Sequence, residues 1–153
     1  MELDKSRRLT DEEYKFIFSR VPRLCLDFII IKDNKIILSK RDIEPYKGFW
    51  HLPGGMVRYK ESFDDAAERI LQDELGVSST NKELIGFIEF PEEVNENGLH
   101  VHSVSIVFKT KLDEGKIRGS KQAGEVDFFE SLPEGVIPAQ NKFLEEHWES
   151  IIS

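Results

Sequence analysis

One stretch of the chain restricts the fold more than any other: a pair of glycines that leads into an amphipathic helix. Gly54 and Gly55 precede the segment 62–75, whose apolar residues follow the spacing of one helix face. Ser62 provides a capping side chain at the start of this segment, and Gly76 is a favourable residue just after its end. The sequence therefore predicts a close backbone turn that runs directly into a half-buried helix.

The other segments predict a mixture of strands and helices. Apolar or alternating patterns predict strands at 24–31, 35–41, 49–52, 84–90, 100–111 and 125–129. Helical spacing predicts one helix near each end, at 14–21 and 140–152. Because strands and helices do not alternate regularly, we expect an α/β fold in which helices cover a mixed, twisted sheet. No repeat or linker divides the chain, so residues 1–153 are expected to form a single domain.

Charge and composition argue against several classes of partner. The formal net charge of −8 at pH 7 disfavours general binding to nucleic acid or to a membrane surface, because both require a basic face. The longest apolar run, around Phe28–Ile31, is too short to cross a bilayer. Cys25 is the only cysteine, which fits a reducing, cytoplasmic location. A small phosphate ligand held through a bound cation remains compatible with the negative charge.

Two adjacent carboxylates on the predicted helix indicate a metal site. At about 100° per residue, Asp73 and Glu74 fall in the same sector as Ala66 and Ile70, toward the apolar side. An ionised carboxylate there is costly unless a cation or hydrogen bonds compensate it. Mg²⁺ prefers a few carboxylate or carbonyl oxygens, together with water and phosphate oxygens. We therefore expect Asp73, Glu74 and the carbonyl of Gly54 to hold Mg²⁺ or Mn²⁺. The alternative is a solvated acidic helix end in which Glu74 pairs with a lysine or arginine.

The same stretch resembles the Nudix box, a glycine loop and acidic helix written G-x5-E-x7-R-E-U-x-E-E-x-G-U, where U is apolar. The residues that match are Gly55, Glu61, Arg69, Leu71, Glu74, Gly76 and Val77. The segment 48–53 also resembles the stretch that precedes the box in that family. The resemblance implies a Nudix-type α/β/α sandwich and Mg²⁺-dependent hydrolysis of a nucleoside diphosphate linked to another group, such as a nucleotide sugar.

Two positions depart from the box. Ile70 stands where the family usually has Glu, which in many members is the general base or helps to bind metal. Asp73 replaces the first Glu of the pair, and its shorter side chain still allows it to reach a metal, directly or through water. An isoleucine has no proton-accepting group, so another residue is expected to activate the water.

Glu125 is the predicted general base, because it is expected at the start of a core strand, after a glycine-containing loop at 119–124 that would carry it over the metal. It also stands near the place where other Nudix enzymes have a further metal-ligand Glu, so the resemblance makes it a candidate further ligand as well. Glu61 is the second candidate, although its charge is also expected to pair with Arg69 and hold the loop against the helix. His100 and His102 alternate on a predicted strand and are the third choice. The resemblance makes Glu125, Glu61 and Arg69 the expected catalytic residues.

The first half of the chain also resembles the GDP-mannose mannosyl hydrolase branch of the Nudix family. That branch likewise lacks the box Glu whose position is taken by Ile70 in this chain. This resemblance implies that Asp27 and Arg41 bind substrate, that Arg69 lies near the diphosphate, and that water attacks the sugar carbon. Trp50 is a candidate to stack on a base. The alternative is that its side chain packs in the core.

The resemblance to that branch is incomplete. Met56 follows the double glycine where the branch has an arginine, and no histidine occurs between residues 113 and 129. Attack at phosphorus therefore stays open. Two further alternatives for the whole protein are a non-catalytic nucleotide-binding Nudix module and a nucleoside triphosphate pyrophosphohydrolase. The expected partner is a small nucleotide, and a homodimer stays open.

Overall fold

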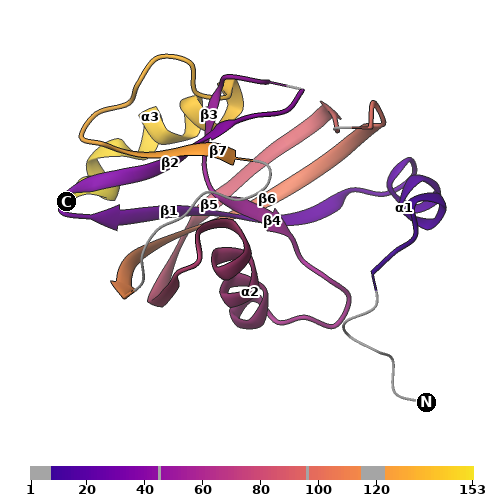
Figure 1. Cartoon of the computed structure of the whole chain (residues 1–153), viewed down its shortest axis with the longest axis horizontal. Coiled ribbons are helices and arrows are strands. Elements are labelled where there is room, and N and C mark those ends of the chain that lie inside the picture. Colours follow the sequence, from indigo (N-terminus) through magenta and orange to yellow (C-terminus); the bar gives the residue numbers. More distant parts are fainter. Residues whose placement is uncertain (1–7, 45, 96, 115–122) are drawn as a thin grey trace.

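A computed structural model describes residues 8–44, 46–95, 97–114 and 123–153. Within these ranges one sheet contains the strands β1 (Arg23–Lys32), β2 (Lys35–Arg41), β3 (Trp50–His51), β4 (Gly54–Met56), β5 (Ser78–Val94), β6 (His100–Glu114) and β7 (Ala123–Phe129). The helices there are α1 (Asp11–Phe18), α2 (Phe63–Leu75) and α3 (Pro138–Ile152). Helices α2 and α3 flank the sheet, and α1 lies beyond its end (Figure 1). The predicted α/β fold with a mixed sheet is confirmed.

Strand β1 occupies the middle of the sheet, whose order is β3-β2-β1-β6-β5. It runs parallel to β6, from Arg23 opposite Ser103 to Ile31 opposite Lys111. The antiparallel partners of β1 are β4 near its start and β2 at its end, and β7 pairs with β2. This pairing places the backbone of Gly54 directly opposite that of Asp27. The glycine loop is thus held to the central strand.

The two faces of the sheet form two cores. Successive residues of β1 point to opposite faces, so Phe28 packs with Ile70 of α2, and Ile29 packs with Leu144 of α3. All four side chains are at most 2% exposed. Full burial of such a side chain stabilises the fold by about 1.5–3 kcal/mol. Tertiary packing of this kind fixes α2 against the strand that carries the polar residues of the site.

Local capping signals explain where the first two helices begin and end. The Thr10 side chain accepts a hydrogen bond from the Glu13 backbone, and the Glu13 side chain accepts one from the Thr10 backbone, which together form a capping box. Ser62 caps α2 by accepting from the Asp65 backbone at 3.1 Å. Gly76 ends α2 with φ of 68°, a left-handed conformation that favours glycine. The predicted limits of α2 are therefore confirmed.

Two strand predictions were incomplete. β5 was expected only at 84–90, but it spans Ser78–Val94 because it pairs with β6 along most of that length. Several register shifts interrupt this pairing, so side chains do not alternate regularly between faces and the sequence pattern is lost. β4 was expected as a loop, and it instead pairs with β1 through Gly54–Met56.

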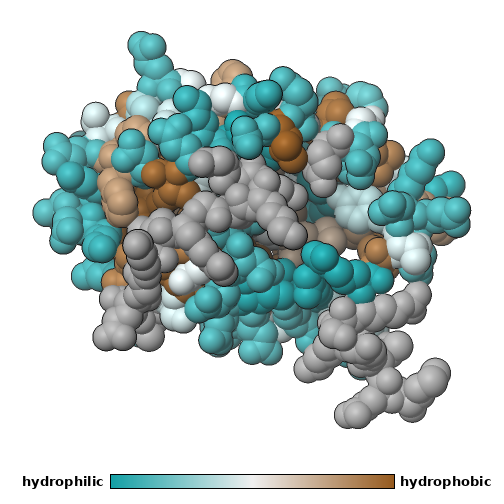
Figure 2. Space-filling view, viewed as in Figure 1, coloured by the Kyte–Doolittle hydropathy of each residue, from teal (hydrophilic) through white to brown (hydrophobic). Residues whose placement is uncertain are grey.

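The outer surface agrees with these assignments. Figure 2 shows hydrophilic side chains over the outer side of α2, whose exposed residues include Asp64, Asp65, Glu68 and Gln72. Among the described residues, no helix combines the length and the apolar character needed to cross a membrane.

Candidate active site

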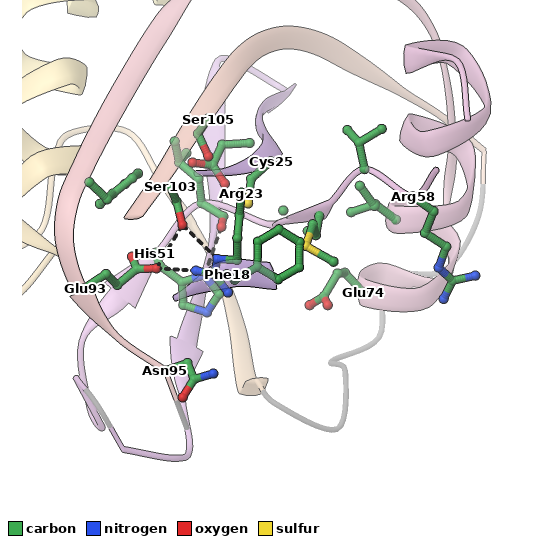
Figure 3. Close-up of a pocket in the computed structure, with 18 of the residues that line it drawn as sticks. Phe18, Arg23, Cys25, His51, Arg58, Glu74, Glu93, Asn95, Ser103 and Ser105 are labelled. Carbon is green, nitrogen blue, oxygen red and sulfur yellow. Dashed lines mark hydrogen bonds and ion pairs between the residues drawn. The ribbon is translucent and has the colours of Figure 1, made fainter. Parts of the chain in front are cut away.

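A cleft of about 760 Å³ lies between α1, the first half of β1 and the unit formed by β4 and α2. Its volume falls in the range of about 300–1,000 Å³ that is usual for small-molecule sites. Of the predicted site residues, those that line it are Asp27, Arg41, Gly54, Arg69, Asp73 and Glu74. Trp50, Glu61 and Glu125 are outside this set. Figure 3 shows Glu74 and Arg58 on one side of the cleft, with Arg23, Glu93, Ser103 and Asn95 on the other.

Gly54 is held so close to β1 that no other residue fits its position. A Cβ atom there would collide with Asp27 Oδ1 and would lie 2.5 Å from the Leu26 carbonyl oxygen. Gly55 has a similar role toward the helix, since its Cβ would lie 3.2 Å from Ile70 Cγ1. Ile70, which stands where the family usually has Glu, is 2% exposed and is buried between α2 and the glycine loop. The two glycines thus allow strand, loop and helix to approach closely.

Glu61 and Arg69 form the ion pair that the sequence predicts. Arg69 donates from Nε to Glu61 Oε2 at 2.7 Å and from Nη2 to Glu61 Oε1 at 2.9 Å. The same Nη2 donates to the Met56 carbonyl oxygen at 2.8 Å, and Glu61 Oε1 accepts from the Arg58 backbone. The hydrogen bonds from Arg69 hold the pKa of Glu61 below its usual range. This pair ties the end of β4 to α2.

Glu74 and Asp73 differ in their surroundings. Glu74 is half-buried, and Figure 3 shows it extending from α2 into the cleft. The Asp73 side chain is 64% exposed, and its Oδ2 lies 4.0 Å from Arg69 Nη1. The predicted orientation of both residues toward one sector of α2 is therefore present, with Glu74 deeper and Asp73 at the rim.

The donor groups of the cleft fit a sparsely ligated hard cation. Within the described part of the chain, no group of three or more His, Cys, Asp or Glu side chains is close enough to bind a metal together. Glu74, Asp73 and the backbone carbonyls of the glycine loop supply oxygen donors only. Mg²⁺ accepts such a set, because it keeps several waters and binds substrate phosphates. A structural zinc site requires a closed set of nitrogen or sulfur ligands, which these residues do not provide.

Asp27 is a buried acid within the cleft. It is 7% exposed, and Gln140 Nε2 lies 3.5 Å from its Oδ2, while Gln140 Oε1 accepts from the Leu52 backbone at 2.8 Å. Burial raises the pKa of Asp27 to about 7, although hydrogen bonds from Ser105 and Gln140 act in the opposite direction. Near neutral pH, Asp27 is therefore present in two forms: the carboxylate accepts hydrogen bonds from a ligand, and the protonated acid can also donate one.

His51 is held as a neutral side chain at the edge of the cleft. Its Nδ1 donates to the Leu52 carbonyl oxygen at 2.9 Å, which leaves Nε2 with a free electron pair and no hydrogen-bond partner among the described residues. Burial, together with a smaller effect of the nearby Arg41 charge, lowers the pKa of His51 to about 4, although the hydrogen bond to the Leu52 carbonyl oxygen acts in the opposite direction.

The depressed pKa of His51 predicts a pH-dependent stability. The unfolded chain binds a proton at His51 near pH 6.5, whereas the folded chain does so near pH 4, so stability is lost as pH falls through this interval. Between pH 7 and pH 5, the wild type should lose about 2 kcal/mol more than the His51→Asn variant. Urea unfolding at both pH values measures this difference, and equal losses in the two proteins would contradict it.

A network of polar side chains connects α1 to the sheet at the far side of the cleft. Arg23 donates to the Tyr14 hydroxyl at 2.6 Å and to Ser103 Oγ at 2.9 Å, and it pairs with Glu93 on β5. Helix α1 buries no residue of its own, so these contacts are important in holding it as a wall of the cleft. Figure 3 shows the network as dashed lines.

Sequence reasoning missed the cleft residues on this side, namely Arg23, Glu93, Asn95, Ser103 and Ser105. One signal was available, because Arg23, Cys25 and Asp27 alternate along β1 and therefore share one face. The facing serines of β6 stand opposite Arg23 and Cys25 in the register. A polar face on two neighbouring buried strands indicates a site rather than a core.

The remaining candidates lie elsewhere. Trp50 packs in the core beneath α3, with its ring 4.9 Å from that of Phe129. Glu125 is exposed. It stands opposite Lys40 of β2, and Lys40 stands opposite Trp50 of β3, so the side chains of all three point to the same face of the sheet. The strand histidines line a separate, shallower hollow. The described residues therefore do not bring Glu125 to the cleft, and its role as general base stays a prediction.

Comparisons with known proteins agree with the loop-helix geometry. A family model described as NUDIX domain matches residues 22–151. The low-salt glycan biosynthesis protein Agl8 of Haloferax volcanii is 30% identical over 140 residues, which covers 90% of each chain. An ADP-ribose pyrophosphatase of Methanocaldococcus jannaschii is 37% identical over 109 residues, covering 71% of this chain and 62% of that protein.

A solved structure shows the same fold. The MutT NUDIX hydrolase of Burkholderia pseudomallei superposes with a TM-score of 0.70 at 27% identity, covering 82% of this chain and 98% of that one. Together with a family model that spans nearly the whole chain, this establishes that the protein belongs to the NUDIX domain family and is a Nudix hydrolase.

Proposed function

We propose that this enzyme hydrolyses a nucleoside diphosphate linked to another group, such as a nucleotide sugar, in a Mg²⁺-dependent reaction. The observation that carries the proposal is a single cleft with two chemically different sides. Arg69, Asp73 and Glu74 line one side, and a polar and aromatic surface lines the other. A diphosphate bound at the first side leaves space along the cleft for the groups attached to it.

The named relatives support a substrate of this class. One of them is an ADP-ribose pyrophosphatase, and ADP-ribose is a nucleoside diphosphate linked to a sugar. Another is named for glycan biosynthesis, a process that consumes activated sugars. Both names agree with a diphosphate substrate that carries a sugar.

The residues of the phosphate side have distinct proposed roles. Glu74, Asp73 and the carbonyl of Gly54 hold the cation, which when bound neutralises diphosphate charge and stabilises the leaving group. Arg69 keeps the glycine loop in place and contributes positive charge beside the cation site. Glu61 acts through Arg69, since both of its carboxylate oxygens accept hydrogen bonds from that guanidinium.

Two further residues are proposed to bind substrate. Arg41 places a cation at the edge of the cleft, where phosphate oxygens or sugar hydroxyls accept hydrogen bonds from it. Asp27 lies opposite the glycine loop and offers a buried carboxyl group to a donor on the substrate. A sugar hydroxyl is a donor of this kind.

A substrate panel tests the proposal. We expect nucleotide sugars or ADP-ribose to be hydrolysed with Mg²⁺ at a kcat/KM at least about tenfold above that for nucleoside triphosphates, a discrimination of about 1.4 kcal/mol. Chromatography of the products, with EDTA in a parallel reaction, measures both substrate class and metal dependence. Faster hydrolysis of triphosphates would replace the proposal with a triphosphate pyrophosphohydrolase.

A further inference from the structure

We propose that Asn95 determines which nucleobase the enzyme accepts, by donating a hydrogen bond to the carbonyl oxygen at position 6 of a purine or position 4 of a pyrimidine. The inference rests on the proposed nucleotide substrate and deepens it. It predicts a preference for guanine or uracil over adenine or cytosine. Asn95 directly follows the last residue of β5 and lines the cleft on the side away from Glu74.

The hairpin between β5 and β6 fixes the orientation of the Asn95 amide. Its Oδ1 accepts from the backbone N–H groups of Asn97 at 3.0 Å and Leu99 at 2.9 Å. Backbone hydrogen bonds from Asn95 to Leu99 and from Gly98 to Asn95 close the same turn. Two donors require an oxygen at this position, so the amide cannot be flipped. The NH₂ group must therefore occupy the opposite end, which Figure 3 shows turned toward the cleft.

This NH₂ group is a donor without an acceptor among the described residues. The residue as a whole is only 9% exposed. Among the described residues, the fully buried side-chain atoms without a partner are Ser39 Oγ and His51 Nε2, so the Asn95 NH₂ group keeps contact with the solvent of the cleft. A carbonyl oxygen of a ligand in the cleft would replace that solvent as its acceptor. The side chain is already locked by the turn, so binding would require little further ordering.

The surroundings of Asn95 suit an uncharged aromatic group. The Arg23 guanidinium pairs with Glu93 and donates to Tyr14 and Ser103. Because its charge is compensated and its donors have partners, it is a poor phosphate-binding group. The Phe18 and Phe90 side chains line the same cleft, and aromatic rings stack favourably on bases. This side of the cleft is therefore suited to a base, and the phosphates belong at Arg69 and Glu74.

A locked donor distinguishes bases by their exocyclic groups. Guanine and uracil present a carbonyl oxygen where adenine and cytosine present an amino group. An amino group facing the Asn95 NH₂ leaves both donors without partners, whereas a carbonyl oxygen accepts. A correct pairing of this kind is worth about 1–3 kcal/mol, which corresponds to about 5–150-fold in affinity.

The Asn95→Asp variant tests the donor without removing the turn. Aspartate keeps the oxygen that accepts from Asn97 and Leu99, but it replaces the NH₂ group with a second acceptor oxygen. The probes are GDP-, UDP-, ADP- and CDP-glucose, which share one sugar. We expect the wild type to prefer GDP- and UDP-glucose by about tenfold or more. In the variant we expect this preference to vanish or reverse, because KM rises for GDP- and UDP-glucose while kcat changes little.

A matched control and a metal-free measurement complete the test. Asn97→Asp introduces the same charge into the same hairpin, but Asn97 is exposed and does not line the cleft, so its base preference should remain that of the wild type. Calorimetry of GMP, UMP, AMP and CMP in EDTA reads base preference without hydrolysis, so it tests Asn95 even if the proposed activity fails. A wild type that binds all four equally, or prefers adenine, would overturn the inference. So would an unchanged ranking in a folded Asn95→Asp variant.

Discussion

Glu74→Gln is expected to lower Mg²⁺-dependent kcat/KM by at least about 10³-fold, while the fold remains intact. Metal stabilisation of transition-state charge is worth several kcal/mol, and each 1.36 kcal/mol is a factor of ten in rate. Glutamine keeps the volume of the side chain but loses the negative charge that holds the cation. The variant should also bind Mg²⁺ more weakly, which titration of activity against Mg²⁺ concentration would show.

The matched control for this prediction is Glu68→Gln. Glu68 is on the same helix and has the same side chain, but it is exposed and does not line the cleft. Its kcat/KM should stay within about twofold of the wild type, as expected for a surface substitution away from the site. Near-normal turnover by Glu74→Gln at every Mg²⁺ concentration would remove Glu74 from the metal site.

Arg69→Met should destabilise the fold by about 2–4 kcal/mol at pH 7, because it removes both guanidinium donors of the partly buried Glu61 carboxylate and the side-chain donor of the Met56 carbonyl. The Arg58 backbone N–H stays as a donor to Glu61. The side chains of Arg69 and Glu61 are 22% and 14% exposed, so the pair is only weakly screened by solvent. Urea unfolding measures the difference from the wild type. Lys35→Met is the control, since its pair with Glu130 is open to solvent at 42% and 80% exposure and should contribute less than about 1 kcal/mol.

The same pair predicts how the effect depends on pH. Arg69 holds the pKa of Glu61 below its ordinary value of 4.5, so the stability it contributes is present above that value and is lost as pH falls through the lower folded pKa. The difference between the wild type and Arg69→Met should therefore shrink below about pH 4.5. A difference that stays constant from pH 7 into this range would show that the pair does not stabilise through charge.

The loop-helix half of the site could be predicted because its signals are local. Ser62 and Gly76 mark the limits of α2, and the helical period places Glu74 on the inner side. The pairing of Glu61 with Arg69 also follows from residues close together in the sequence. Each of these inferences needs only the geometry of one helix and the loop before it, so no knowledge of the sheet order is required.

The other half of the site depends on the arrangement of the strands, which the sequence does not show. Arg23 meets Glu93 and Ser103 only because β1 runs parallel to β6 and β6 pairs with β5. Asn95 reaches the cleft because β5 extends well beyond its predicted end at residue 90. Trp50 shows the reverse case: its aromatic ring suggested stacking on a base, but its side of β3 packs against the core under α3, which is the alternative the sequence left open.

The most direct test follows a nucleotide sugar by ³¹P NMR in ¹⁸O-labelled water, with and without Mg²⁺. We expect the two diphosphate signals of the substrate to disappear only when Mg²⁺ is present, and Glu74→Gln to slow this conversion by at least about 10³-fold. Label in a phosphate product would indicate attack at phosphorus, and label in the sugar would indicate attack at carbon. Intact substrate at every Mg²⁺ concentration, in a sample that hydrolyses nucleoside triphosphates, would overturn the proposed hydrolysis of a nucleotide sugar.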